Sequence, residues 1–312
     1  MTDVVGDNND NIGSNFSSLT KLTIGKCHTL SSIEQFLHPA YVPGIKIIEI
    51  QYCHRLVSLP SFRHSSCLEE LKVCTCPNIN SSSLYAPSLK KLELKEDCGN
   101  LADNIDCSSL TYLHISQSHS TSIQLQISAG TFPSLTELTI TNCSKLQTVD
   151  DLHVSFPLLT DLLISHCQLP NGQKGMKLPA SLKSLELLGC EDLSAWFPRC
   201  LENLASLMFM KVHHCKGELS IPGHMWSSNL ASLRLLQIHG CPDLVSVGGP
   251  KAIAGIEKVW IERCPKFKEL KQPVFESGFR EINVVCLDGT WAYTCLISMF
   301  LITTARIHMH NT

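Results

Sequence analysis

The chain has 312 residues, of which 44% are apolar and 17% are charged, and this composition excludes an intrinsically disordered chain. Its 25 basic and 28 acidic side chains give a formal net charge of −3. A protein that binds nucleic acid through its phosphates would show a basic surplus, so we expect no nucleic-acid partner.

The first segment, residues 1–15, is rich in Asp, Asn and Gly and lacks the apolar core of a secretory signal. We therefore expect a disordered polar N-terminal segment and a cytoplasmic protein. The sixteen cysteines are then expected to be reduced thiols, because disulfides persist mainly in oxidising compartments.

From residue 16 to residue 287 one pattern recurs, L-x-x-L-x-I/L/V-x-x-C-x-x-L. Its copies lie 21 to 26 residues apart and begin at Leu19, Ile45, Leu68, Leu89, Leu110, Leu135, Leu159, Leu182, Leu207, Leu233, Ile256 and Phe279. The alternation of apolar and polar residues predicts one short strand per repeat, with one buried face. No repeat can cover its own apolar residues, so we expect about twelve repeats to stack as a solenoid. A curved parallel sheet would form its concave face, and irregular coil or short helical turns its convex face.

Nine of the sixteen cysteines occupy one position of the repeat, just after the strand: Cys27, Cys53, Cys76, Cys143, Cys167, Cys190, Cys215, Cys241 and Cys264. That position needs a small, buried side chain that can donate weakly to a carbonyl. We therefore assign these cysteines to the architecture. Three repeats depart from the pattern, because Cys98 comes one residue late, Ser118 replaces the cysteine, and Cys286 comes one residue early.

The C-terminal tail, residues 288–312, does not follow the repeat. Its stretch 291–305 has no charged residue but is shorter than the about 20 apolar residues of a membrane span. We expect a strand or helix that caps the last repeat. A membrane-associated segment and an aberrant terminus are the alternatives.

The repeat motif, as in residues 45–60 and in the run FPSLTELTITNC at 132–143, resembles the leucine-rich repeats of plant intracellular immune receptors. The resemblance is to the coiled-coil type of nucleotide-binding leucine-rich-repeat disease resistance protein, grass members in particular. It implies a β-rich α/β leucine-rich-repeat solenoid that acts in the defense response. In that family the array recognises a pathogen effector, or a host protein altered by one, and restrains a nucleotide-binding switch.

The nucleotide-binding switch itself has no counterpart in this sequence. No G-x-x-x-x-G-K-[ST] motif occurs, and the run 248–251 (GGPK) lacks the spacing and the hydroxyl that bind phosphate. We therefore expect no bound nucleotide and no cofactor. The resemblance implies instead a nucleotide-binding domain as a partner, in the same chain or in another.

On the concave face, each predicted strand exposes the residue between its two buried ones and the residues just beyond them. In the last repeats this column becomes aromatic at Trp260, which offers a large contact area at low entropic cost. We expect a protein partner to bind around it, at Lys211, His213, His214, Gln237, His239, Trp260 and Arg263.

Three of these residues, His213, His214 and His239, fall on adjacent predicted strands and are the best candidates for zinc ligands. No acidic or further cysteine side chain completes the set, so we expect contact histidines and no metal. The sequence also lacks G-x-S-x-G, H-E-x-x-H, C-x-x-C and dinucleotide-binding motifs. We therefore expect no catalytic residue and no enzymatic activity.

Two other functions could use the same scaffold. An adaptor that selects substrates for a ubiquitin ligase needs a docking motif before the repeats, and residues 1–15 are too short and too polar to supply a helical one. A membrane-tethered repeat receptor would depend on the stretch 291–305 as its anchor.

Overall fold

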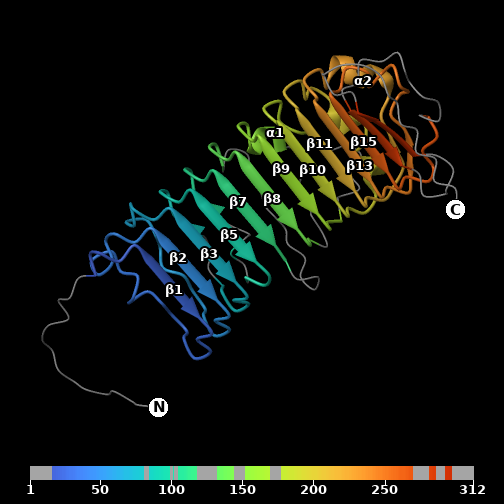
Figure 1. The fold of residues 1–312 in the computed structure, drawn as a ribbon. Helices are drawn as coiled ribbons and strands as arrows, with labels where there is room; N and C mark the ends of the chain where they lie inside the picture. The colour runs from blue at the N-terminus through green and yellow to red at the C-terminus, as the bar shows by residue number, and fades with distance from the viewer. Residues whose placement is uncertain are drawn as a thin grey trace, which may run out of the picture.

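The structure is a computed structural model that describes residues 16–80, 84–98, 101, 105–117, 132–143, 152–168 and 177–269, and the backbone of residues 281–285 and 292–296. Within these residues one thirteen-stranded sheet runs along the molecule (Figure 1). Its strands, in spatial order, are β1 (Lys21–Gly25), β2 (Ile47–Gln51), β3 (Glu70–Cys74), β5 (Lys91–Lys95), β7 (Tyr112–Ser116), β8 (Glu137–Thr141), β9 (Asp161–Ser165), β10 (Ser184–Leu188), β11 (Phe209–His213), β13 (Leu235–His239), β15 (Lys258–Glu262), β16 (Glu281–Val285) and β17 (Ala292–Leu296). The neighbours from β1 to β16 pair in parallel.

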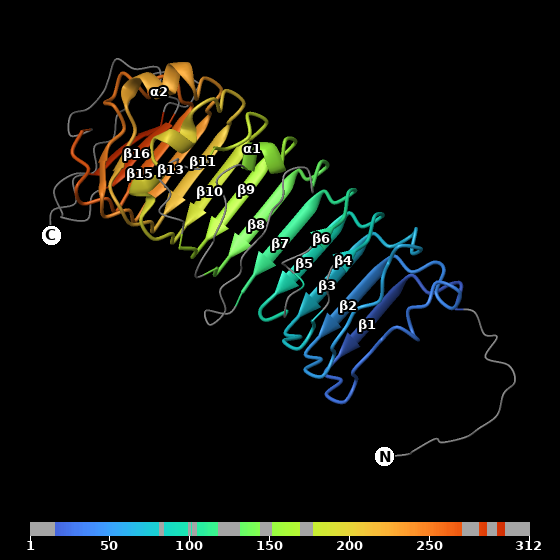
Figure 2. The same cartoon turned by 180° about the vertical axis from the view of Figure 1, so that it is seen from behind.

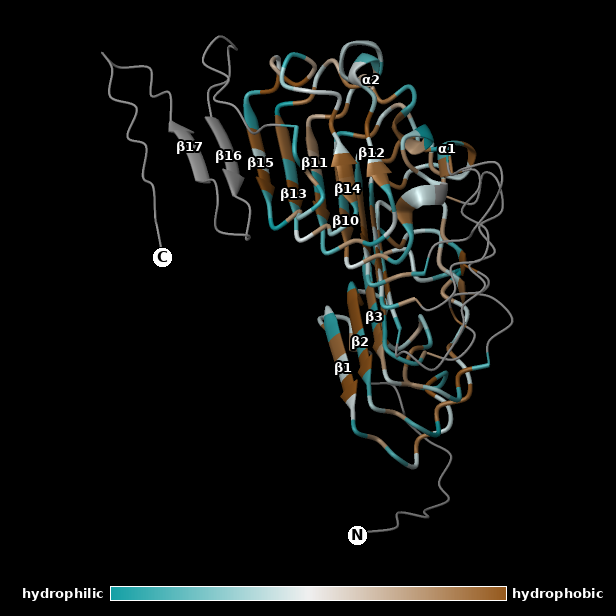
Figure 3. Cartoon of the chain, turned by 90° about the vertical axis from the view of Figure 1, so that its right-hand side faces the viewer, coloured by the Kyte–Doolittle hydropathy of each residue, from teal (hydrophilic) through white to brown (hydrophobic). Residues whose placement is uncertain are grey.

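The sheet forms one side of the molecule, and loops with a few short elements form the other (Figure 2 and Figure 3). These elements are the strand pairs β4 (Leu84–Tyr85) with β6 (Ile105–Asp106) and β12 (Leu219–Ser220) with β14 (Leu244–Ser246), the helices α1 (Leu152–Ser155) and α2 (Gly223–Ser228), and the 3-10 turns Leu193–Ala195 and Arg199–Leu201. The predicted solenoid, with its parallel sheet on the concave face, is confirmed.

Each strand begins two residues after a repeat start, so equivalent positions of successive repeats lie side by side. Leu22, Ile48 and Leu71 are register partners in β1, β2 and β3. The second and fourth residues of each inner strand point into the core, as Ile48 and Ile50 do with no exposed surface. The first, third and fifth residues face the concave side. The number of repeats stays a prediction, because several turns pass through residues outside the described ranges.

Eight of the nine repeat cysteines are buried in the core and Cys27 is partly buried, and each donates to a backbone carbonyl at the end of the preceding strand. Sγ of Cys215 lies 3.3 Å from the carbonyl oxygen of His213. Cys98, one residue late in the sequence, is also buried, and its Sγ lies 3.2 Å from the carbonyl oxygen of Lys95. All fourteen cysteines in the described residues are free thiols. The irregular repeat therefore fills the same place in the core, whereas Ser118 and Cys286 lie outside the described residues.

The residue that follows a strand adopts a left-handed backbone conformation in most repeats. Ten residues at this position have a positive φ: Lys26, Tyr52, Thr75, Glu96, Asn142, His166, Gly189, His214, Gly240 and Arg263. Within the described residues, the N–H groups of eight of them, all but Glu96 and Arg263, donate to a carbonyl of the next repeat, as in the 2.7 Å bond from His166 to the carbonyl of Leu188. This turn brings the chain from the strand to the buried cysteine. The sequence analysis did not predict it.

The tail contributes β17, which pairs antiparallel with β16 at the end of the sheet. A strand that caps the end of the sheet would pair with β16 in this way. That the tail caps the last repeat stays a prediction. The residues 1–15 and 297–312 lie outside the described ranges. Among the helices that the structure describes, none is long and apolar enough to cross a lipid bilayer.

Candidate functional site

The C-terminal half of the concave face brings most of the predicted contact residues together. Lys211, Gln237 and Trp260 are register partners at the centres of β11, β13 and β15. His213 and His239 are register partners at the ends of β11 and β13. The repeat spacing alone places these five residues in two adjacent columns.

His214 and Arg263 lie one residue beyond their strands, in the left-handed turn, with φ of 54° and 56°. The expectation that three histidines occupy adjacent strands is therefore wrong for His214. The repeat ends its strand before the turn, and the turn places this side chain at the rim of the concave face. Both residues are exposed there.

Trp260 has 40% of its surface exposed, although it belongs to a strand of the sheet. Its Nε1 donates to Oε2 of Glu262 at 3.2 Å, and Oε1 of Glu262 lies 3.5 Å from Nε of Arg263. Glu262 thus holds the indole and the guanidinium in place together. The sequence analysis did not single out Glu262, which faces the same side as Trp260 two residues further along the strand.

Lys211 does not offer a free charge. Its Nζ lies 2.6 Å from Oε1 of Glu186, the residue at the same position of β10, and both side chains are partly buried. Such a pair is worth about 1 kcal/mol or less where water reaches it. A partner can therefore contact Lys211, or replace Glu186 as its ion-pair partner, at a small cost in free energy.

His239 contacts both His213 and His214 through ring edges. The His239 centroid lies 4.8 Å from that of His214 and 5.7 Å from that of His213. Burial, and then the neighbouring His239, lowers the pKa of His213, whose buried Nε2 has no hydrogen-bond partner among the residues that the structure describes. Within the described part of the chain, no three His, Cys, Asp or Glu side chains converge as metal ligands.

Two apolar residues that the sequence analysis did not name extend this surface. Phe209 is 41% exposed and Leu235 is half-buried, and they are register partners at the first positions of β11 and β13. The predicted contact set drew on the third and fifth positions of the strands and on the turns, but side chains alternate along a strand, so the first residue faces the concave side as well. Phe209, Leu235 and Trp260 together are the aromatic patch.

The N-terminal half of the same face is different, because its charged side chains neutralise one another. Six ion pairs join seven residues across β1, β2, β3 and β5: Lys21–Glu49 (3.0 Å), Lys72–Glu49 (3.5 Å), Lys72–Glu70 (3.2 Å), Lys91–Glu70 (3.2 Å), Lys91–Glu93 (3.0 Å) and Lys95–Glu93 (2.7 Å). We call this set the charge ladder. Burial alone would raise the pKa of Glu93, but Lys95 and Lys91 outweigh it and lower that pKa to about 2.

No family model matches the sequence, and no curated protein matches it. Among solved structures, CroV588, described as a novel circular leucine-rich-repeat protein, aligns with 79% of this chain at a TM-score of 0.50 and 16% identity. The fold is a leucine-rich-repeat solenoid. The plant peptide hormone receptor RGFR1 in complex with RGF2 aligns with 86% of the chain, at a TM-score of 0.45 and 13% identity. The chain spans 38% of the first structure and 49% of the second.

A shallow groove of about 350 Å³ borders the aromatic patch of this leucine-rich-repeat solenoid. It crosses the residues that lead into β11, β13 and β15, and it is lined by Ser206, Met208, Ala231, Ser232, Leu233, Arg234, Gly255 and Glu257. Its charged side chains, Arg234 and Glu257, can form ion pairs with a ligand. A nucleophile with an adjacent base does not occur in this lining. The groove is a candidate contact surface for a ligand.

Proposed function

We propose that the chain is a protein-recognition scaffold without enzymatic activity, and that it binds its partner on the C-terminal half of the concave face. The observation that carries the proposal is the exposure of Phe209 (41%) and Trp260 (40%) on strands whose inward residues are almost fully buried. Exposed aromatic side chains on a rigid surface are typical of the energetic centres of protein interfaces.

In its finer form, the proposal is that this array senses ligands in a plant intracellular immune receptor and acts in the cytoplasm. The resemblance of the repeat motif to that family supports it. The partner is then a pathogen effector or a host protein altered by one, and the array restrains a nucleotide-binding domain in the same chain or another. The contact set is Lys211, His213, His214, Gln237, His239, Trp260 and Arg263, now joined by Phe209, Leu235 and Glu262.

The experiment compares the wild-type chain with the double variant Trp260→Ala/Arg263→Ala as bait in affinity capture from grass leaf extract, quantified by mass spectrometry. We expect at least one protein that the wild type captures and the double variant loses. Both side chains are exposed, so the variant should keep the circular dichroism spectrum of the wild type.

The matched control is Val154→Ala, which removes an exposed apolar side chain from α1, away from the sheet. This variant should capture the same proteins as the wild type. Equal capture by the double variant and the wild type would contradict binding at this surface. Unfolding of the double variant would contradict the surface placement of Trp260.

A further inference from the structure

The aromatic patch presents one apolar side chain on each of three neighbouring strands. Phe209 and Leu235 occupy the first positions of β11 and β13, and Trp260 occupies the third position of β15. Neighbouring strands lie about 4.8 Å apart, and Trp260 lies two residues, about 6.6 Å, further along its strand, so the row of three side chains is about 12 Å long. Their row crosses the strands obliquely.

This spacing matches an α-helix better than an extended chain. An α-helix rises about 1.5 Å per residue, so eight residues of a helix laid along this oblique row cover its length of about 12 Å. Apolar residues at i, i+4 and i+8 of the helix, which share one face, would then meet Phe209, Leu235 and Trp260 in turn. In an extended chain, side chains of one face recur about every 6.6 Å, so three of them span about 13 Å, which is longer than the row.

The sheet itself also disfavours an added strand at this place. Both edges of β11 and of β13 are already paired, to β10 and β13 and to β11 and β15 respectively. A partner strand therefore finds no backbone donors or acceptors to extend the sheet there. The five-residue strands give a face about 16 Å wide, which accommodates a helix about 10 Å in diameter.

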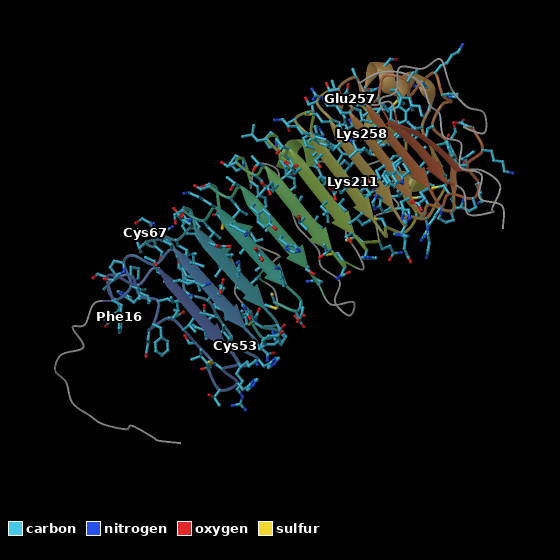
Figure 4. The ribbon with its side chains drawn as sticks, in the orientation of Figure 1. Phe16, Cys53, Cys67, Lys211, Glu257 and Lys258 are labelled. Carbon is cyan, nitrogen blue, oxygen red and sulfur yellow. The ribbon has the colours of Figure 1, made fainter. Side chains whose placement is uncertain are left out.

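Cations outnumber carboxylates around the patch. The concave and rim positions of β10, β11, β13 and β15 carry five cationic side chains, Lys183, Lys211, Arg234, Lys258 and Arg263, and three carboxylates, Glu186, Glu257 and Glu262. Two of the carboxylates already pair with Lys211 and Arg263. Figure 4 shows Lys258 and Glu257 where the chain enters β15, and Lys211 on β11. The surplus charge favours an acidic ligand.

From these observations, we infer that the aromatic patch binds an amphipathic α-helix of the partner protein, whose apolar stripe is flanked by carboxylates. The inference rests on the proposed function and names the partner chemistry of the same site. The apolar stripe covers Phe209, Leu235 and Trp260, and the carboxylates approach Arg234 on one side and Arg263 on the other. The charge ladder offers no comparable surface, because its carboxylates and ammonium groups already satisfy one another.

The test measures binding of fluorescent synthetic peptides to the full chain by anisotropy. The first probe is a helical peptide of about five turns, with Leu and Phe in one stripe and Glu on the flanks. The second has the same composition in an order that gives no helical stripe and alternates apolar and acidic residues as a strand would. The third keeps the stripe and replaces Glu by Lys. We expect the first probe to bind at least about tenfold more tightly than either of the others.

Variants of the chain locate the site. We expect Phe209→Ala and Trp260→Ala each to weaken binding of the first probe by about tenfold, and Val154→Ala to leave it unchanged. Arg234→Glu should weaken the acidic probe and strengthen the Lys probe, which is a change of preference that unfolding cannot produce. Circular dichroism checks the fold of each variant.

If the alternating probe bound more tightly than the first probe, the inference would be overturned in favour of an extended partner segment. If the Lys probe bound more tightly than the first probe, the acidic character of the partner would be contradicted. Absence of binding by all three probes would also overturn the inference. None of these outcomes would overturn the proposed function, because capture that depends on Trp260 and Arg263 tests recognition without assuming a helical partner.

Discussion

At the scale of single residues, the cysteines show how burial decides chemistry. Burial raises the pKa of Cys98 and of Cys107 to about 12, whereas Cys67 is exposed. Since the thiolate is the nucleophile, we expect iodoacetamide to label Cys98 and Cys107 at least about a hundredfold more slowly than Cys67 near neutral pH. Timed labelling followed by peptide mass spectrometry measures the rates. In guanidinium the labelling rates of the three cysteines should converge. Equal labelling rates in the folded chain would contradict the burial of Cys98 and Cys107.

The buried carboxylate of the charge ladder gives a prediction about pH. Lys95 and Lys91 lower the pKa of Glu93 to about 2 in the folded chain, from an ordinary value of 4.5. A depressed folded pKa stabilises the fold above pH 4.5, and this contribution is lost as the pH falls toward 2. We therefore expect Glu93→Gln to lower the free energy of unfolding by about 1 to 2 kcal/mol near pH 7.

The pH dependence of that difference is the decisive observation. Urea unfolding of the wild type and of Glu93→Gln at several pH values should show a gap that narrows below pH 4.5 and is nearly closed near pH 2. The exposed pair of Lys216 and Glu191 supplies the control, because Glu191→Gln should change stability little at any pH. A gap for Glu93→Gln that stays constant with pH would show that its charge is not what stabilises the fold.

At the scale of the repeat element, the strands were predictable and the turns after them were not. Leu138 and Ile140 alternate with Thr139, and the same spacing recurs along the chain, so the hydrophobic pattern determines both the strand and its register. The left-handed residue that follows has no such pattern, since Lys26, His166 and other unlike residues all adopt it. Backbone geometry rather than residue type is what the repeats share there.

The concave face could be predicted only in part for a related reason. Register places Lys211, Gln237 and Trp260 in one column, and the repeat spacing alone was enough to predict that. The pairing of Trp260 with Glu262 depends on side-chain rotamers, which spacing does not specify. The exposure of Phe209 depends on how far its neighbours reach, and this too requires the packed structure.

The turn after β13 gives the prediction at this scale. Gly240 has a φ of 63°, and a Cβ there would lie 2.5 Å from Nδ1 of His214. We expect Gly240→Ala to lower the free energy of unfolding by about 1 to 3 kcal/mol, through the left-handed backbone and the clash together. In a chain that already carries His214→Ala, Gly240→Ala should lower the free energy of unfolding by less, because the clash is gone and only the strain of the left-handed backbone remains. A double-mutant cycle by urea unfolding separates the two terms, and a coupling energy near zero would contradict the contact.

For the whole molecule, stability is distributed between neighbouring repeats. Ile48 and Ile50 in β2 have no exposed surface, because the repeats of β1 and β3 cover them on both sides. Their equivalents Leu22 and Ile24 in β1 are only partly buried within the described residues. Each fully buried side chain of this size contributes about 1.5 to 3 kcal/mol before entropy is subtracted, so the β1 end is the weaker part of the array.

Hydrogen exchange followed by mass spectrometry tests this distribution. We expect the amides of Lys21–Gly25 to exchange before those of Ile47–Gln51, and those of Ser184–Leu188, covered on both sides, to exchange among the slowest. Ile50→Ala leaves a cavity that lowers the free energy of unfolding by about 2 to 5 kcal/mol. In a nearest-neighbour array this loss should speed amide exchange in β1, β2 and β3 and leave exchange in β13 unchanged. Ile238→Ala is the matched variant, and it should speed exchange in β11, β13 and β15 and leave β2 unchanged. If either substitution accelerated all strands equally, the chain would unfold as one cooperative unit, and the nearest-neighbour description of the solenoid would fail.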